Sequence, residues 1–315
     1  MRILVTGAAG NLGSHVSRHL LASGHELRLL IHEKPLPADM ASASNVECCR
    51  ADLGNVAGLD AICRNVDCIV HLAGVLFAPR PSEFLPKTNV GFVENLVQAA
   101  LQVGVRKFLL LSFPHVEGET NPEHPATNRL ETNSDVIHFR TRLEAERRLL
   151  NLTKGTQLVP VVIRAGVVYG HGIKLIEAAR TLLRYRILAV WKAPTWVHLI
   201  SLPDLLRAIQ AAIDNPGSSG IYNVCDDAPL TIQEFLDRLA AHWNYPRPWR
   251  LPTWILLASA AACEALAALL RTPSPLTRDI IKAGMTSSVA DNQRMKRELL
   301  PVLAFPTLGQ GLTLL

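Results

Sequence analysis

The stretch HFRTRLEAERRLL, which begins at His138, carries two side chains that could do chemistry together. His138 and Arg142 are four residues apart, so on a helix they share one face. An imidazole titrates near neutrality and is the group most often used as a general acid or base. A guanidinium stays charged, grips a phosphate or a ribose through its planar fork, and lowers the pKa of a nearby imidazole by like-charge repulsion. Such a pair could transfer a proton beside a bound phosphate or ribose.

A glycine-rich turn near the N-terminus predicts where the phosphates of that ligand bind. TGAAGNLG (6–13) places Gly7, Gly10 and Gly13 between an apolar run and an amphipathic stretch. Gly7 permits a tight turn, Gly10 lets a pyrophosphate approach the backbone, and Gly13 lets the helix pack closely on the sheet. The free N–H groups and the positive end of the helix dipole then face the phosphates. The segment indicates a dinucleotide site.

The elements that must position these residues alternate along the first half of the chain. Short apolar runs alternate with helical patterns, which is typical of a parallel sheet covered on both faces. We therefore expect an α/β protein with a Rossmann-type doubly wound parallel sheet of seven strands and a smaller C-terminal substrate-binding lobe. Residues 1–168 should form the NAD(P)-binding domain, completed by parts of 197–228, and residues 169–315 mainly the second lobe. The predicted strands are 2–7, 25–32, 66–74, 106–112 and 157–166, and the predicted helices include 11–24, 89–104, 197–213 and 230–243.

The composition limits the classes of partner. Of the 315 residues, 49% are hydrophobic and 19% charged, with a net charge of +5, which is an ordinary globular balance. No run of Lys and Arg is present, so we expect a small-molecule substrate and no nucleic acid. The six cysteines show neither Cys-x-x-Cys nor zinc spacing, so we expect no metal and reduced thiols. The N-terminal stretch does not resemble a signal peptide, which favours a cytoplasmic location.

The stretch LPTWILLASAAACEALAALL (251–270) has about the roughly 20 residues that a bilayer requires. Pro252 near one end, Glu264 inside and the weakly hydrophobic alanines argue against a membrane span. We expect a buried helix over the substrate cleft or in a subunit contact. Attachment to a membrane surface is the less favoured alternative.

Together these motifs resemble the extended, here atypical, short-chain dehydrogenase/reductases of the NAD-dependent epimerase/dehydratase group, along nearly all of the chain. TGAAGNLG is similar to the family's TGxxGxxG, and HLAG (71–74) to the loop that lines the cofactor after the fourth strand. VIRAGVVYGHG (162–172) resembles the segment beside the nicotinamide, with Ala165 in place of the usual proline. The resemblance implies cofactor contacts from Gly7, Ala9, Gly10, Asn11, Leu12, Gly13, His32, Asp52, Leu53, Leu72, Ala73, Gly74, Arg142, Ala165 and Val167.

The end of the second predicted strand favours NADP, with NAD as the alternative. An acid that binds the ribose of NAD would be expected at its tip, but LLIHEKP places Ile31 and His32 there. Basic groups near this point would suit the 2′-phosphate of NADP. Glu33 keeps NAD open, because its carboxylate could reach a ribose hydroxyl.

The chain departs from the family where the resemblance implies catalysis. A Tyr-x-x-x-Lys pair does the acid–base work in the family, and His138 and Arg142 occupy those two positions here. The family's Ser or Thr at the end of the preceding strand is replaced by Pro114, with Ser112 two residues earlier. The catalytic candidates are therefore His138, Arg142 and Ser112.

Three hypotheses follow for the function. The first is an NAD(P)-dependent oxidoreductase or epimerase-like enzyme that acts on a carbonyl or alcohol of a small apolar substrate, with His138 as acid–base. The second is a catalytically inactive NADP-binding regulatory protein. The third is a non-redox lyase or dehydratase that uses another residue, with candidates Tyr169, His115, Glu117 and His198. We favour an enzyme, and the resemblance also suggests a homodimer through helices 89–104 and 140–152.

Overall fold

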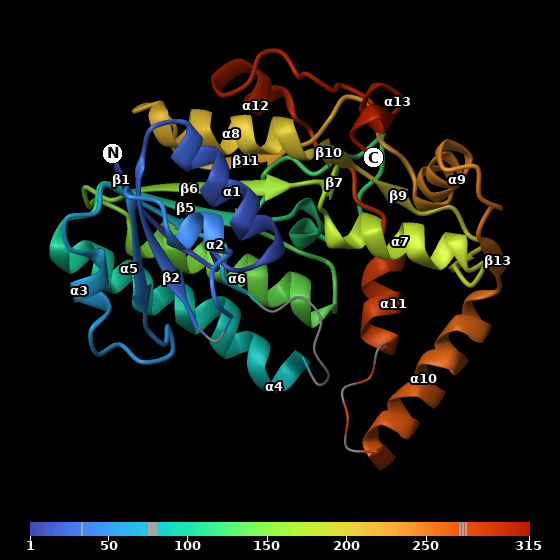
Figure 1. Cartoon of the computed structure of the whole chain (residues 1–315). Coiled ribbons are helices and arrows are strands. Elements are labelled where there is room, and N and C mark those ends of the chain that lie inside the picture. The colour runs from blue at the N-terminus through green and yellow to red at the C-terminus, as the bar shows by residue number, and fades with distance from the viewer. Residues whose placement is uncertain (33, 75–80, 271, 273, 275) are drawn as a thin grey trace.

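A parallel sheet of seven strands forms the centre of the larger lobe in this computed structural model (Figure 1). The structure describes residues 1–32, 34–74, 81–270, 272, 274 and 276–315. The strand order is β11-β6-β5-β4-β1-β2-β3, and every pairing is parallel. The predicted α/β fold is confirmed, and its last strand comes from the second half of the chain. The strands are β1 (Arg2–Thr6), β2 (Glu26–Ile31), β3 (Val46–Arg50), β4 (Cys68–His71), β5 (Lys107–Ser112), β6 (Val159–Ala165) and β11 (Gly220–Val224).

Helices cover both faces of this sheet, because successive strand residues point to opposite sides. Ile3 and Val5 belong to one apolar core, whereas Leu4 between them belongs to the other. The first core is covered by α1 (Asn11–Ala22), α2 (Ala38–Ala41), α8 (Leu202–Asp214) and α12 (Gln293–Glu298). The second is covered by α3 (Leu59–Cys63), α5 (Phe92–Val103) and α6 (Ile137–Leu152). Before α5 the chain runs through α4 (Pro81–Leu85) and the π-helix η1 (Pro86–Gly91), and after β5 through the short 3-10 helix η2 (Pro114–Glu117).

The smaller lobe has an apolar core of its own, which includes Tyr169, Leu199 and Phe235. Three two-stranded sheets frame it, and β7 leads into it directly from β6. Its helices include α7 (Lys174–Arg184), α9 (Ile232–His242), α11 (Arg278–Met285) and α13 (Leu308–Gly311), and the 3-10 helix η3 (Leu312–Leu314) ends the chain. The paired strands are β7 (Val167–Tyr169) with β10 (Leu199–Ser201), β9 (Trp196–Val197) with β12 (Leu230–Thr231), and β8 (Ala189–Trp191) with β13 (Trp249–Leu251).

Helix α10 (Thr253–Leu270) differs from its expected environment. The prediction of a buried helix over the substrate cleft is wrong, because only 11% of its 18 residues are buried in the chain. Figure 1 shows it as an arm that leaves the body of the lobe, with α11 beside it. By length and composition it is the one helix among the described residues that could cross a membrane. A subunit contact through this helix stays a prediction.

Candidate active site

The glycine turn joins β1 to α1 and packs against the loop that follows β4. Gly7 has φ +72°, a left-handed conformation that favours glycine. A Cβ added to Gly7 would lie 2.8 Å from the backbone nitrogen of Ala73, and one added to Gly13 would overlap the Gly7 carbonyl. Gly10 is exposed at the N-terminus of α1, which leaves that helix end open to a ligand. Ala9 and Leu12, on either side, are half-buried.

Asn11 links this turn to the smaller lobe. Its side-chain nitrogen donates to the Gly172 carbonyl at 2.7 Å, and its side-chain oxygen accepts from the Lys174 backbone nitrogen at 2.9 Å. The side chain is therefore occupied by the start of α7. A contact from Asn11 to a cofactor would come from its backbone, and the predicted contact stays a prediction.

The HLAG loop meets helix α6 at Gly74. Leu72 and Ala73, which precede it, are half-buried between the turn and this helix. A Cβ added to Gly74 would lie 2.9 Å from the Nη2 of Arg142 and 4.0 Å from the Oδ1 of Asn89. The absence of a side chain at Gly74 thus brings a cation and an amide oxygen to the same point.

Arg142 is a buried cation with no partner for its Nε among the described residues. Burial lowers the pKa of this guanidinium to about 10, although Glu146 raises it, so the charge persists at neutral pH. Two further buried atoms in this region have no hydrogen-bond partner in the described chain, the Oδ1 of Asn89 and the Nε2 of His71. Because unpaired buried polar groups are costly, this set fits a bound ligand that carries both hydroxyls and negative charge.

His138 lies one helical turn before Arg142 on α6 and is half-buried. Burial and the charge of Arg142 lower its pKa below the usual 6.5, whereas Asp279 on α11 opposes that shift. The imidazole is therefore neutral at pH 7. The influence of Asp279 also places α11 of the smaller lobe near this end of α6.

Ser112 takes part in a buried ion network. Its hydroxyl donates to Oε1 of Glu146, whose other oxygen lies 2.6 Å from Nη2 of Arg164. Nη1 of Arg164 lies 2.6 Å from Oε1 of Glu117, and the Arg164, Glu146 and Glu117 side chains are fully buried. The Ser112 hydroxyl proton is thus already used in a hydrogen bond to Glu146, and a catalytic role for Ser112 stays a prediction.

The sequence pattern did not single out Glu146 or Arg164. Two signals could have found them. Glu146 follows Arg142 by four residues and extends the face of α6 that carries His138. Arg164 is the one charged residue in the apolar run VVIRAG, and a charge within a central strand calls for a buried partner.

Among the other candidate residues of the non-redox hypothesis, His198 and Tyr169 are buried and His115 is half-buried. Both nitrogens of His198 are bonded, since Nε2 lies 2.9 Å from the Asp226 carbonyl and Nδ1 accepts from the Ala290 backbone at 3.2 Å. Tyr169 is fully buried against Gly311, and burial raises its pKa. Burial lowers the pKa of His115 to about 4, and its ring lies 5.3 Å from that of Phe139. The fourth, Glu117, belongs to the ion network.

Three of the predicted cofactor contacts, His32, Asp52 and Leu53, follow β2 and β3 at one edge of the sheet. His32 follows β2 and is exposed, and the register places Ile31 opposite Arg50, a cation that the sequence pattern did not single out. Asp52 is exposed with its side chain accepting from the Gly54 backbone at 2.8 Å, while Leu53 is buried. Glu33, the acid that kept NAD open, lies outside the described residues.

Ala165 and Val167 lie where the chain passes from the sheet into the smaller lobe. Ala165 ends β6, and Val167 begins β7 and donates to the His198 carbonyl at 2.8 Å. A Cβ added to Gly166 would lie 2.6 Å from the same carbonyl. The tight crossing keeps this segment beside the sheet edge, and its contact with a cofactor stays a prediction.

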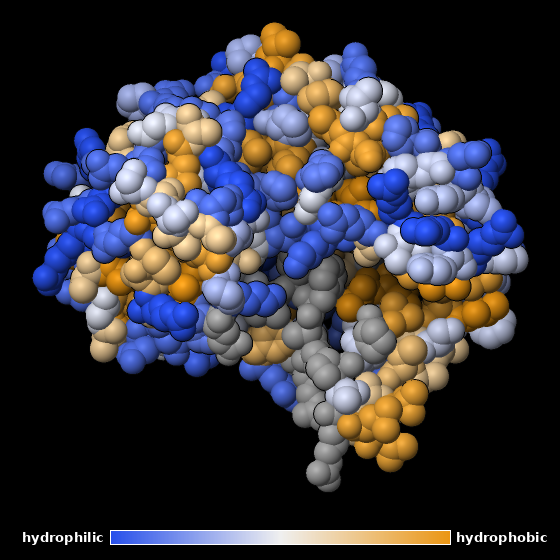
Figure 2. Space-filling view, viewed as in Figure 1, coloured by the Kyte–Doolittle hydropathy of each residue, from blue (hydrophilic) through white to orange (hydrophobic). Residues whose placement is uncertain are grey.

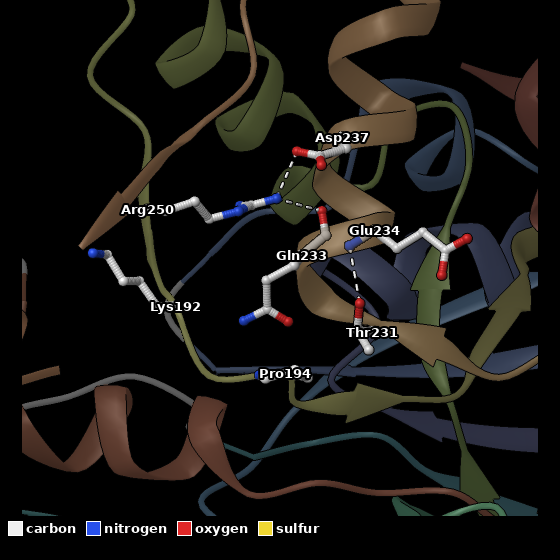
Figure 3. A pocket seen from close by; sticks show the side chains of 7 residues that line it. All are labelled: Lys192, Pro194, Thr231, Gln233, Glu234, Asp237 and Arg250. Atoms are coloured by element: carbon white, nitrogen blue, oxygen red, sulfur yellow. Dashed lines mark hydrogen bonds and ion pairs between the residues drawn. The ribbon is translucent and has the colours of Figure 1, made fainter. Parts of the chain in front are cut away.

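A separate pocket of about 440 Å³ lies in the smaller lobe (Figure 3). Arg250 crosses it and donates to the Asp237 carboxylate at 2.6 Å and to the Gln233 carbonyl at 2.9 Å. It shares no residue with the glycine turn or with α6, so it is distinct from the candidate active site. The lining residues are Lys192, Pro194, Thr231, Gln233, Glu234, Asp237 and Arg250. In the described parts of the chain, no three His, Cys, Asp or Glu side chains gather as they would around a metal.

Comparison with known proteins places this arrangement in context. Residues 3–225 match the family described as NAD dependent epimerase/dehydratase family. The chain is 25% identical over 297 residues to a ceramide reductase of Caulobacter vibrioides, covering 91% of this chain and 86% of that one. It is 24% identical over 260 residues to a UDP-glucose 4-epimerase of Vibrio cholerae, covering 79% and 78%. Among solved structures, the UDP-glucose 4-epimerase of Thermus thermophilus in complex with NAD has a TM-score of 0.75 and 23% identity, with 100% of this chain and 97% of that one covered.

Proposed function

The chain belongs to the NAD dependent epimerase/dehydratase family, and on this premise we propose that it is an NAD(P)-dependent oxidoreductase in which His138 does the acid–base work. The observation that carries the proposal is the buried guanidinium of Arg142, four residues after His138. It lies against Gly74, and its Nε has no hydrogen-bond partner among the described residues. A buried charge of this kind is stabilised when a ligand supplies its partner.

The residues around Gly74 fit the cofactor of this family. A nicotinamide cofactor would supply or accept the hydride. Arg142 would donate hydrogen bonds to its ribose or phosphate oxygens, and the free Oδ1 of Asn89 would accept one from a hydroxyl. The exposed N-terminus of α1 at Gly10 would bind the pyrophosphate through backbone N–H groups.

His138 would exchange a proton with the substrate oxygen. Because its pKa is lowered, the neutral ring is ready at pH 7 to accept the proton of an alcohol. The resulting imidazolium would return that proton when a carbonyl is reduced. Arg142 cannot titrate in this range, so its part is to bind and to keep His138 neutral until reaction.

We propose NADP as the preferred cofactor. The support comes from the basic side chains at the edge formed by β2 and β3, where His32 and Lys34 follow the strand and Arg50 lies opposite Ile31. Cations at this edge would bind the 2′-phosphate. Replacing Arg50 by Glu should weaken NADPH binding more than NADH binding.

We propose an apolar substrate. Phe113 follows Ser112 directly, and its ring lies 5.8 Å from that of Phe139, so aromatic side chains gather at the end of β5 near the start of α6. The similarity to a ceramide reductase along 91% of the chain favours the same class of compound. Turnover of a nucleotide sugar, but of no apolar carbonyl or alcohol, would contradict this assignment.

A second candidate function is nucleotide binding without turnover. One observation favours it, because the Ser112 proton is committed to Glu146 and Pro114 cannot polarise a substrate oxygen. In that case Arg142 would still bind the cofactor, and His138 would take no part in catalysis.

The test combines cofactor titration with turnover. The purified protein is titrated with NADPH and NADH by nicotinamide fluorescence and then assayed with apolar alcohols and carbonyls. We expect tight NADPH binding, turnover by the wild type, and a loss of at least about 100-fold in rate for His138→Ala, with binding retained. His124→Ala, at an exposed loop histidine, is the matched control. Binding with no turnover of any substrate would favour the second candidate, and no binding of either nucleotide would contradict both.

A further inference from the structure

Helix α10 presents a large apolar surface to solvent. Its mean hydropathy is 1.8, and its buried residues are Ala260 and Ala267. Figure 2 shows hydrophobic side chains gathered at the free end of this arm. The most exposed large side chains are Trp254 at 69%, Leu266 at 57%, Leu269 at 80% and Leu270 at 61%.

The distribution of this surface around the helix indicates what covers it. Ala260 and Ala267 are seven residues apart, so they form one line along the helix. Helix α10 as a whole contacts α11 and β8. The remaining residues of the helix are exposed or half-buried and almost wholly apolar, with Glu264 as the one charged residue in 253–270. A second copy of the helix would cover one further side. A lipid phase covers every open side at once, and helices apolar all round are found in such surroundings or in a core.

The topology excludes a simple membrane crossing. Arg278 at the start of α11 pairs with Glu264 at 2.8 Å, so the chain turns back along α10. Beyond α11 it is tied to the body of the protein, where the Ser288 nitrogen donates to the Trp196 carbonyl at 2.9 Å. The chain therefore leaves the body at the start of α10 and rejoins it after α11, so the arm can enter a bilayer but cannot carry the chain across it.

The base of the arm carries groups suited to a lipid headgroup region. Trp249, at 63% exposure, and Trp254 flank the start of α10. Arg186 and Arg247 line one hollow together with Trp249, and Lys192 donates its backbone N–H to the Leu251 carbonyl just before α10. All three cations are exposed, and no ion pair to their side chains is found within the described residues. The nearby acids are already paired, Asp237 with Arg250 and Glu234 with Arg238. Figure 3 shows the Lys192 side chain near Arg250, with no interaction between Lys192 and the other residues drawn. Tryptophan side chains are typical of the membrane–water interface, and cations without a protein partner can bind the phosphates of anionic lipids there.

We propose that α10 and the basic rim at its base attach the protein to the surface of a membrane that contains anionic lipids. The exposed face of α10 enters the hydrocarbon of one leaflet, the two tryptophans lie at the interface, and Arg186, Lys192 and Arg247 face lipid phosphates. The attachment does not depend on the proposed function, since it is measured without cofactor or substrate.

The experiment is flotation of the full chain with vesicles of phosphatidylcholine, with or without phosphatidylglycerol. We expect the wild type to float with the anionic vesicles and less with the neutral ones. The double variant Leu266→Asp/Leu269→Asp should bind at least about tenfold more weakly, because an aspartate is strongly disfavoured in hydrocarbon. Val302→Asp, at a side chain 72% exposed on another part of the surface, is the matched control and should bind as the wild type does. Arg247→Gln/Lys192→Gln should remove most of the preference for phosphatidylglycerol.

Two results would overturn the proposal. One is a wild type that stays unbound with both kinds of vesicle. The other is a wild-type dimer that Leu266→Asp/Leu269→Asp dissociates, with no vesicle binding, which would assign the surface to a second copy of the chain. NADPH affinity and melting temperature of each variant show whether it is folded, and a shift of wild-type tryptophan fluorescence on vesicles tests attachment without any variant.

Discussion

Oε2 of Glu146 lies 2.6 Å from Nη2 of Arg164, and both side chains are fully buried. The same carboxylate accepts the Ser112 hydroxyl, so α6 is bonded to the ends of β5 and β6 at once. Glu146 shares the helix face of Arg142 and His138. The pair therefore fixes the rotation of α6 and keeps Arg142 directed at Gly74.

Replacing Glu146 by Gln should destabilise the protein by about 3–5 kcal/mol, because it leaves the buried Arg164 with an incomplete partner. The free energy of unfolding in urea measures this loss. Glu144→Gln, on the same helix but in a half-exposed pair with Arg148, should change stability by less than about 1 kcal/mol. Equal effects of the two substitutions would show that the buried network does not hold α6.

Replacing Arg142 by Met should weaken NADPH binding by at least about tenfold while leaving stability equal or higher. The reason is that the guanidinium is buried and its Nε has no partner in the described parts of the chain. Removing it therefore removes a desolvation cost that a bound ligand would otherwise offset. Fluorescence titration and thermal unfolding measure the two effects. Arg140→Met, two residues away and exposed, is the control. A destabilised variant with unchanged affinity would mean that Arg142 is structural.

The pKa of His138 should rise when Arg142 is replaced by Met. Arg142 is one of the two causes that lower it, whereas burial, the larger cause, remains. The low-pH limb of activity, where the base becomes protonated, should move to higher pH by the same shift. NMR titration of the histidine ring signals measures the pKa directly, with His138→Ala identifying the resonance. An unchanged pKa would indicate that the two groups are too far apart to interact.

Asp226→Asn should stabilise the protein increasingly as the pH rises from about 4 to about 8. Burial, with smaller contributions from the charges of Asp227 and Asp204, raises the pKa of this carboxyl to about 8 against a hydrogen bond from Ala228 that lowers it. The folded state therefore keeps the proton that the unfolded chain loses near 3.8. Wild-type stability then falls with pH in this window, by up to about 1.4 kcal/mol per pH unit, and is level above it. Unfolding at several pH values measures the difference. Asp135→Asn, an exposed acid, should show none of it.

Much of the fold and part of the site could be predicted from the sequence. Alternating strand and helix patterns define the parallel sheet, because burial on both faces requires continuous apolar strands. The roles of Gly7 and Gly13 in the turn could be predicted from the sequence, and in the structure the backbone at both positions leaves no room for a Cβ. The spacing of His138 and Arg142 is sufficient to place them on one face of a helix, since helix periodicity is local.

The tertiary structure alone decided how each of these groups is used. Ser112 had a position that suited catalysis, but its hydroxyl reaches Glu146, 34 residues away in sequence. The sequence shows that α10 is apolar but not that it is exposed. Burial of a helix depends on which other segments of the chain pack against it in the folded protein. Local propensity and glycine geometry are properties of neighbours along the chain. Pairing, exposure and pKa arise from residues brought together by folding.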